Sequence, residues 1–209
     1  MRLWMAALSG ALLTACGQDP AIPPTPEPSA AALEAGLPSP GTATEATKQA
    51  NASLAARLDL APGSDGKDAR RDRIAYIEDE AILAEDGSVV WAIPQFEFLD
   101  GDAPETVNPS LWRQSQLAAH HGLFKVMDGI YQVRGYDLAV MTVIEGDTGW
   151  IIVDPLTATE TAAASLKLVN DTLGERPVTG VLYTHSHADH FGGARGVISD
   201  EDVANGVPI

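Results

Sequence analysis

The chain has 209 residues, 45% of them hydrophobic, which is enough for one domain with a buried core and appendages. Its formal net charge of −16 argues against nucleic acid as a partner, because phosphate binding needs a basic face. The same charge repels an anionic substrate at long range, so a site for such a substrate would need divalent cations to reverse the local field.

The N-terminus predicts export. Arg2 precedes an apolar run over residues 3–13 that is too short to span a bilayer as a mature helix. The run ends in Leu-Thr-Ala-Cys16, which resembles the bacterial lipoprotein signal, whose cysteine becomes the lipidated first residue. We expect a signal peptide over residues 1–15, lipidation of Cys16 and a periplasm-facing protein anchored to the bacterial cell envelope. The alternative is a buried helix in which Cys16, the only cysteine, is incidental.

Residues 16–43 have the composition of a disordered linker. Seven of the 14 prolines lie between Pro20 and Pro40, among Ala, Thr, Ser and Glu. Such a segment cannot bury enough apolar area to fold, and it favours extended polyproline geometry. We expect it to hold the folded part of the chain away from the membrane.

Residues 44–121 are expected to form a helical and irregular segment. Thr42 and Glu45 have the spacing of a capping box, so folded structure should begin at Thr42. Apolar residues then recur every four positions on one face of a helix, at Ala46, Ala50, Leu54 and Leu58.

Weaker signals follow in the same segment. Pro62-Gly63 ends the first helix, and a second, more charged helix is expected over residues 67–77. A short strand is expected over residues 88–91 and a helical turn or two over residues 111–119.

From Gly122 the pattern changes to strands. The sequence predicts four of them, over residues 123–126, 130–133, 138–144 and 150–153. Asp128-Gly129, between the first two, is a strong hairpin signal. The chain therefore enters an antiparallel sheet here.

A helix is expected after the fourth strand. Thr157 and Glu160 form a second capping box, and Gly174 provides the stop. Its buried face is marked by Ala162, Leu166, Val169 and Leu173. A fifth strand, over residues 178–183, completes a β-α-β unit. Loops at the carboxyl ends of such strands are where α/β sheets usually place their ligands.

Three of the five histidines and one carboxylate lie within six residues after that strand: His185, His187, Asp189 and His190. Zinc prefers such ligands, and His185 and His187, two apart on extended backbone, can point the same way. A helix beginning near Asp189 would favour the carboxylate anion and neutral imidazole, the forms that metals bind. The segment therefore predicts a metal site. The alternative is a set of solvated loop histidines beside a helix cap.

The spacing His185-x-His187-x-Asp189-His190 after a strand resembles the metal signature of the metallo-β-lactamase fold. Asp154, at the end of the preceding strand, resembles the acidic residue beneath the metals in that fold. The flanking sequence resembles the alkyl sulfatases of this superfamily more specifically, over residues 101–104, 106–114, 121–126, 129–135, 144–150 and 154–157.

This resemblance runs from about Thr47 to Ile209 and implies an α/β fold class. Residues 122–209 would form a partial metallo-β-lactamase-like domain, the N-terminal half of an αββα sandwich. The family-specific helical segment and the lipoprotein tether would precede it.

The resemblance further implies a zinc-dependent hydrolase that splits alkyl sulfate esters into an alcohol and sulfate through a metal-activated water. By similarity, His185 and His187 would bind the first of two zinc ions, and Asp189 and His190 the second. Asp189 would also be catalytic, and Asp154 would orient a ligand histidine. A homodimer is expected for the complete protein.

The family's remaining zinc ligands and its sulfate-binding residues are not found in this sequence. We therefore expect a fragment that binds metal weakly and does not turn over substrate. Two other functions stay open. One is a different hydrolase of the same fold, such as a lactamase, lactonase or thioesterase, and the other is a non-catalytic lipoprotein.

Several other polar and aromatic side chains are candidates for the same site. His120 and His121 could approach the metals, and Arg113, Arg134 and Tyr136 could face an anionic ester. Loop exposure and surface pairing are the commoner roles for these residue types, and we expect those roles. The tryptophans Trp91, Trp112 and Trp150 are expected to pack against neighbours rather than to line a groove for an alkyl chain.

Overall fold

The computed structural model describes residues 41–58, 64–77 and 81–209. The chain divides into two compact units, Met1–Gly41 and Thr42–Ile209, and the described residues belong almost entirely to the second. The predicted signal peptide, Cys16 and nearly all of the predicted linker lie outside the described residues. Within the described ranges, no helix is both long enough and apolar enough to cross a membrane.

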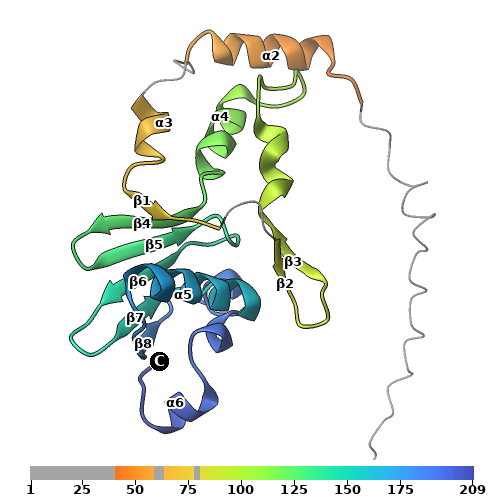
Figure 1. Ribbon diagram of the computed structural model, residues 1–209. Helices are drawn as coiled ribbons and strands as arrows, with labels where there is room; N and C mark the ends of the chain where they lie inside the picture. Colours follow the sequence, from red (N-terminus) through yellow and green to blue (C-terminus); the bar gives the residue numbers. More distant parts are fainter. Residues whose placement is uncertain (1–40, 59–63, 78–80) are drawn as a thin grey trace, which may run out of the picture. The chain divides into compact units, whose positions relative to one another are not determined.

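A six-stranded sheet forms the centre of the second unit (Figure 1). Its strands, in spatial order, are β1 (Arg73–Ala75), β4 (Gly122–Met127), β5 (Ile130–Arg134), β6 (Met141–Glu145), β7 (Trp150–Val153) and β8 (Val178–Leu182). Neighbouring strands are antiparallel, except that β7 and β8 run parallel. A separate two-stranded sheet joins β2 (Ala81–Leu83) to β3 (Val89–Ala92). The predicted α/β fold class is confirmed.

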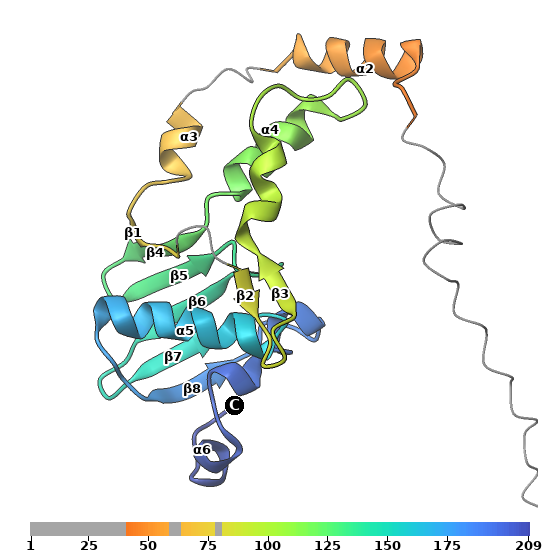
Figure 2. The ribbon, with the colours of Figure 1, turned by 45° about the vertical axis from the view of Figure 1, so that its right-hand side comes forward.

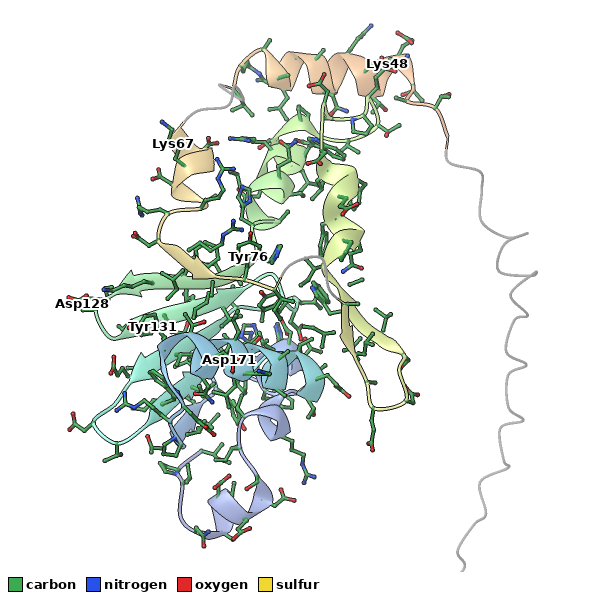
Figure 3. The ribbon with its side chains drawn as sticks, in the orientation of Figure 1. Lys48, Lys67, Tyr76, Asp128, Tyr131 and Asp171 are labelled. Carbon is green, nitrogen blue, oxygen red and sulfur yellow. The ribbon has the colours of Figure 1, made fainter. Side chains whose placement is uncertain are left out.

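The predicted hairpin at Asp128-Gly129 is present between β4 and β5. Gly129 has φ 74°, a left-handed conformation that favours glycine, and Lys125 forms an ion pair with Asp128 at 2.7 Å. Figure 3 shows Asp128 at the tip of this hairpin and Tyr131 at the start of β5. The next strand was predicted to begin at residue 138, but β6 begins at Met141 because the preceding loop turns inward around a buried carboxylate, Asp137.

Helix α5 (Thr159–Leu173) lies across one face of the sheet (Figures 1 and 2). On the predicted apolar face, Ala162 and Val169 are fully buried, while Leu166 and Leu173 are partly buried against the core. Gly174 ends the helix as predicted, with φ 101°. The predicted capping box is wrong. The N-cap is Ala158, which makes no side-chain cap, because the Thr157 hydroxyl donates to Asp137 instead.

Helix α2 (Glu45–Ala55) begins later than predicted. Its N-cap is Thr44, whose hydroxyl accepts from Thr47 N at 3.2 Å, so the capping box predicted at Thr42 is wrong. No residue of α2 is buried, so its predicted apolar face is not covered. Polar contacts attach the helix instead, among them the bond from Asn51 Nδ2 to the Glu105 carbonyl at 2.8 Å.

The helix predicted over residues 67–77 is also wrong. Helix α3 spans only Ser64–Asp68, and the chain then forms β1, in which Arg73 lies opposite Phe124 of β4. Pairing with a long neighbouring strand outweighs the weak local helix signal. Nearer the sheet, β3 and α4 (Pro109–Ala118) lie within two residues of their predicted bounds, and η1 (Ile93–Leu99) connects the β2–β3 ribbon to the loop before α4.

The tryptophans take two kinds of position. Trp150 is 1% exposed, and its Nε1 donates to Asn170 Oδ1 on α5 at 2.8 Å, which confirms its packing role. Trp91 packs against Phe96 with tilted rings, and Trp112 meets Phe98 edge to face. These two tryptophans also line a largely apolar cavity of about 650 Å³ between η1, α4 and the β5–β6 loop, so the expectation that they only pack is incomplete.

Candidate metal centre

The candidate site lies at the carboxyl ends of β7 and β8. These strands are parallel, and Val153 lies opposite Leu182, so the residues that follow them meet at one edge of the sheet. Asp154 follows β7, and the histidine segment follows β8. The β-α-β order of the sequence thus brings together two groups that are about thirty residues apart.

Asp154 is the buried anchor of this edge. It is 7% exposed, and its carboxylate accepts hydrogen bonds from Thr184 N at 2.8 Å, from Thr184 Oγ1 at 2.7 Å and from His190 Nδ1 at 2.8 Å. Burial alone would raise the pKa of Asp154, but these three bonds outweigh it and hold the pKa below its ordinary value. The carboxylate is therefore ionised at neutral pH.

The three histidine rings gather beside this anchor. The ring centroids of His185 and His187 are 4.6 Å apart, and those of His185 and His190 are 4.0 Å apart. His185 Nδ1 lies 3.0 Å from the Thr184 hydroxyl. Asp189 and His190 belong to η2 (Ala188–His190), a single helical turn.

Asp189 and His190 have the spacing of two ligands on one ion. Asp189 Oδ2 lies 3.3 Å from His190 Nε2. Two donor atoms about 2.0–2.2 Å from a tetrahedral zinc ion lie about 3.3–3.6 Å apart, and the separation of this pair is within that range. Asp154 occupies the other ring nitrogen of His190, which is the arrangement that orients metal-bound histidines.

Across the described parts of the chain, no group of three or more His, Cys, Asp or Glu side chains is arranged to hold a metal ion. His185 and His187 are exposed. Among the described residues, the His185 ring contacts the Thr184 hydroxyl, and no hydrogen bond to the His187 ring is found. The types of the four residues, and the spacing of Asp189 and His190, suit zinc. The rings of His185 and His187 lie nearby but do not point at a common ion position.

The other candidate residues have different surroundings. Arg113 pairs with Asp65 at 2.6 Å, and the Arg134 guanidinium lies 4.4 Å from the centre of the Phe124 ring. The Tyr136 hydroxyl accepts from Ile77 N at 2.7 Å. None of these contacts involves the histidine segment.

The two remaining histidines lie on the β1 side of the sheet. His121 Nε2 is 3.2 Å from the Ile77 carbonyl, and its ring meets the edge of Tyr76, which Figure 3 labels. His120 lies 3.4 Å from Arg70. Burial lowers the pKa of His120, and the nearby arginines lower it further, so this ring is held neutral.

Two residues of the site were not assigned a role from the sequence. Thr184 links the histidine segment to Asp154 through both its amide and its hydroxyl. Asp137 binds the loop that follows Asp154, through the amide of Thr157 at 3.0 Å. Both look like ordinary turn residues in the sequence, because their partners are 20 to 30 positions away.

Comparison with known proteins places these features in a family. The family model described as the metallo-beta-lactamase superfamily matches residues 134–208. The alkyl/aryl-sulfatase BDS1 of Saccharomyces cerevisiae is 48% identical over 161 residues, which are 77% of this chain and 25% of that protein. A linear primary-alkylsulfatase of Pseudomonas sp. is 48% identical over 166 residues, 78% of this chain and 25% of that protein.

Solved structures agree. The inverting sec-alkylsulfatase Pisa1 from Pseudomonas sp. superposes with a TM-score of 0.73 and 46% identity, over 80% of this chain and 26% of that one. The chain thus spans about a quarter of the length of the relatives that it matches. Residues 134–208 thus carry the metallo-beta-lactamase superfamily match, and the chain is similar over about four fifths of its own length to part of the alkylsulfatases.

Proposed function

We propose that this chain carries zinc-binding residues of an alkyl sulfate ester hydrolase, which releases an alcohol and sulfate. The observation that carries the proposal is the Asp189–His190 pair at 3.3 Å, held by Asp154 beneath it, in a chain 48% identical to an alkylsulfatase. His185 and His187 would hold one ion, and Asp189 and His190 a second. Because the relatives are about four times as long as the matched region, the activity is proposed for the protein as a whole.

The residues have separate tasks in this proposal. Bound zinc would supply Lewis acidity, which activates water and offsets the negative charge of the sulfate ester. The ionised Asp154 keeps the proton of His190 on Nδ1, so that Nε2 presents its lone pair toward Asp189. Asp189 contributes the anionic donor, and a bound cation would offset its charge in a chain of net charge −16.

The apolar cavity agrees with an alkyl substrate. It borders the β5–β6 loop, which the antiparallel order of β5, β6 and β7 places at the same edge of the sheet as Asp154. Phe96, Leu111 and Trp112 are among its apolar lining residues. Moving the hydrocarbon chain of such an alcohol from water to this surface would lower the free energy.

Zinc stoichiometry tests the proposal directly. The purified chain is dialysed against zinc and its metal content is measured by mass spectrometry, beside a His185→Ala/His187→Ala double variant and an Asp189→Ala variant. We expect zinc in the wild type, a loss in both variants and no change in a His120→Ala control. Equal zinc in all four proteins contradicts the proposal, as does hydrolysis of dodecyl sulfate that is unaffected by chelation.

Lipid attachment at Cys16 and a periplasmic location are part of the same proposal. They are supported by the short apolar run and the Leu-Thr-Ala-Cys16 sequence. Fractionation of expressing cells should find the chain with the membranes, and Cys16→Ala should release it. Mass spectrometry that finds Met1 retained in the mature protein would contradict lipidation. The proposed homodimer is tested by light scattering of the full-length protein.

A further inference from the structure

Asp137 is a buried carboxyl group held by hydrogen bonds. It is 7% exposed, and no ion pair to it is found among the residues that the structure describes. Five donors point at it: Leu138 N at 2.6 Å, Thr157 N at 3.0 Å, Thr157 Oγ1 at 2.6 Å, Ala158 N at 3.3 Å and Thr161 Oγ1 at 2.5 Å. A carboxylate with this many donors fixes the backbone that supplies them, because losing it would strand several buried polar groups.

Four of these donors belong to the loop between β7 and α5 and to the first turn of that helix. The N-cap residue of α5, Ala158, provides no side-chain cap of its own. Asp137 replaces that cap from the β5–β6 loop, twenty residues earlier in the chain, where it also meets the positive end of the helix dipole. The loop is therefore tied to the sheet at its helical end.

The other end of the same loop holds the metal-site anchor in an unfavourable backbone conformation. Asp154 has φ 55° and Leu156 has φ 63°, both in the left-handed region, and Leu156 N donates to the Asp154 carbonyl at 2.8 Å. Residues without a glycine's freedom stay in this region only when surrounding contacts hold them there. From this conformation the Asp154 side chain reaches Thr184 and His190.

The turn after the histidines packs on this loop as well. Gly193 N donates to the Leu156 carbonyl at 2.9 Å. A Cβ atom at Gly192 would lie 2.3 Å from the Thr157 carbonyl oxygen, and one at Gly193 would lie 2.3 Å from that of Pro155. The loop thus lies between Asp137 on one side and the backbone that follows the proposed ligands on the other.

From these contacts we infer that Asp137 is a positioning residue for the metal site. It clamps the β7–α5 loop, which holds Asp154 in the conformation that binds Thr184 and orients the His190 ring through Nδ1. The inference rests on the proposed metal site for its functional meaning. Its structural content can be measured without metal.

The test compares Asp137→Asn, a milder Thr157→Val variant and an Asn170→Ala control. Thr157→Val removes only the hydroxyl bond at an exposed residue, so it should fold even where Asp137→Asn does not. Asn170→Ala removes a part-buried acceptor of the same helix at its other end, where Oδ1 accepts from Trp150 Nε1. Urea unfolding of each variant gives the stability change against which local effects are judged.

The first readout is hydrogen exchange at the Thr184 amide and the ¹⁵N spectrum of the His190 ring, both in metal-free protein. We expect Thr184 exchange to accelerate at least tenfold in Asp137→Asn and severalfold in Thr157→Val, with the His190 Nδ1–H signal broadened in both. The control should change neither beyond its effect on global stability. The inference would be overturned if Asp137→Asn or Thr157→Val gave the same Thr184 exchange and the same His190 spectrum as the Asn170→Ala control.

The second readout is zinc affinity, measured by competition with a chromophoric chelator. It should weaken about tenfold in Asp137→Asn and stay unchanged in Asn170→Ala. Zinc affinity that is equal in Asp137→Asn and wild type would confine Asp137 to a structural role and overturn the inference. A wild-type chain that binds no zinc, but whose Thr184 and His190 respond as expected, would contradict the proposed function and leave the positioning role standing.

Discussion

His190 Nδ1 lies 2.8 Å from Asp154 Oδ2, and this contact joins the end of β7 to the loop after β8. Asp154 is kept ionised by its donors, so the bond requires a proton on Nδ1. The other ring nitrogen, Nε2, faces Asp189 at 3.3 Å. One buried carboxylate thereby fixes the orientation of the ring of a proposed metal ligand.

Replacing Asp154 by alanine should weaken zinc binding by about 10- to 100-fold, the usual effect of removing the partner that orients a metal-bound histidine. Chelator competition on the purified chain measures this. Asp171→Ala is the matched control, because it removes the same charge from an exposed pair with Lys167 on α5 (Figure 3). Equal affinities in the two variants would show that the contact with His190 has no bearing on metal binding.

The strands β4 to β8, and the place of the histidine segment after β8, could be predicted because their signals are local. Asp128-Gly129 favours a hairpin in any context, and the histidine spacing after an apolar run needs no tertiary information. The β7–α5–β8 unit then follows from ordinary connection rules, which place Asp154 beside the histidines.

The errors involve residues whose partners are distant in sequence. Arg73 pairs with a strand fifty residues away, which no local propensity indicates. Thr157 has the spacing of a helix cap, but Asp137 takes its hydroxyl. Asp137 itself looks like a turn residue until the β5–β6 loop is seen against the start of α5. Where several local choices are close in energy, tertiary contacts decide.

Replacing Trp150 by phenylalanine should lower the free energy of unfolding by about 1–3 kcal/mol, because Asn170 Oδ1 loses its indole donor inside the core. Urea unfolding followed by circular dichroism measures the loss. Trp112→Phe provides the comparison: its Nε1 bond to the Gly101 carbonyl lies at the surface, so we expect a smaller change. A larger loss for Trp112 would contradict this account of the core.

His120 should make the fold sensitive to acid. Its pKa in the folded chain lies below the ordinary value of 6.5, because of burial first and then the charges of Arg70 and Arg73. The unfolded chain therefore binds this proton more readily, so the contribution of His120 is present above pH 6.5 and is lost as the pH falls through the folded pKa.

The His120→Gln variant tests this dependence. The urea midpoint of the wild type, relative to that of the variant, should be lower at pH 5 than at pH 8. The other histidines are the same in both proteins, so their contributions cancel in the comparison. A difference that stays constant, or that grows in favour of the wild type on acidification, would contradict the direction of the shift.

Gly193→Ala should disturb the site through the backbone alone. The new Cβ would lie 2.3 Å from the Pro155 carbonyl oxygen and 2.5 Å from that of Ala158, distances at which the loop must move. Overpacking of this kind costs about 1–3 kcal/mol, and here the strain falls on the loop that carries Asp154. Unfolding should show that loss, and the ring resonances of His190 should shift. Gly41→Ala, which meets nothing within 4 Å, should do neither. If Gly193→Ala left both stability and the His190 spectrum unchanged, the close packing of the β7–α5 loop between Asp137 and the histidine segment would be contradicted.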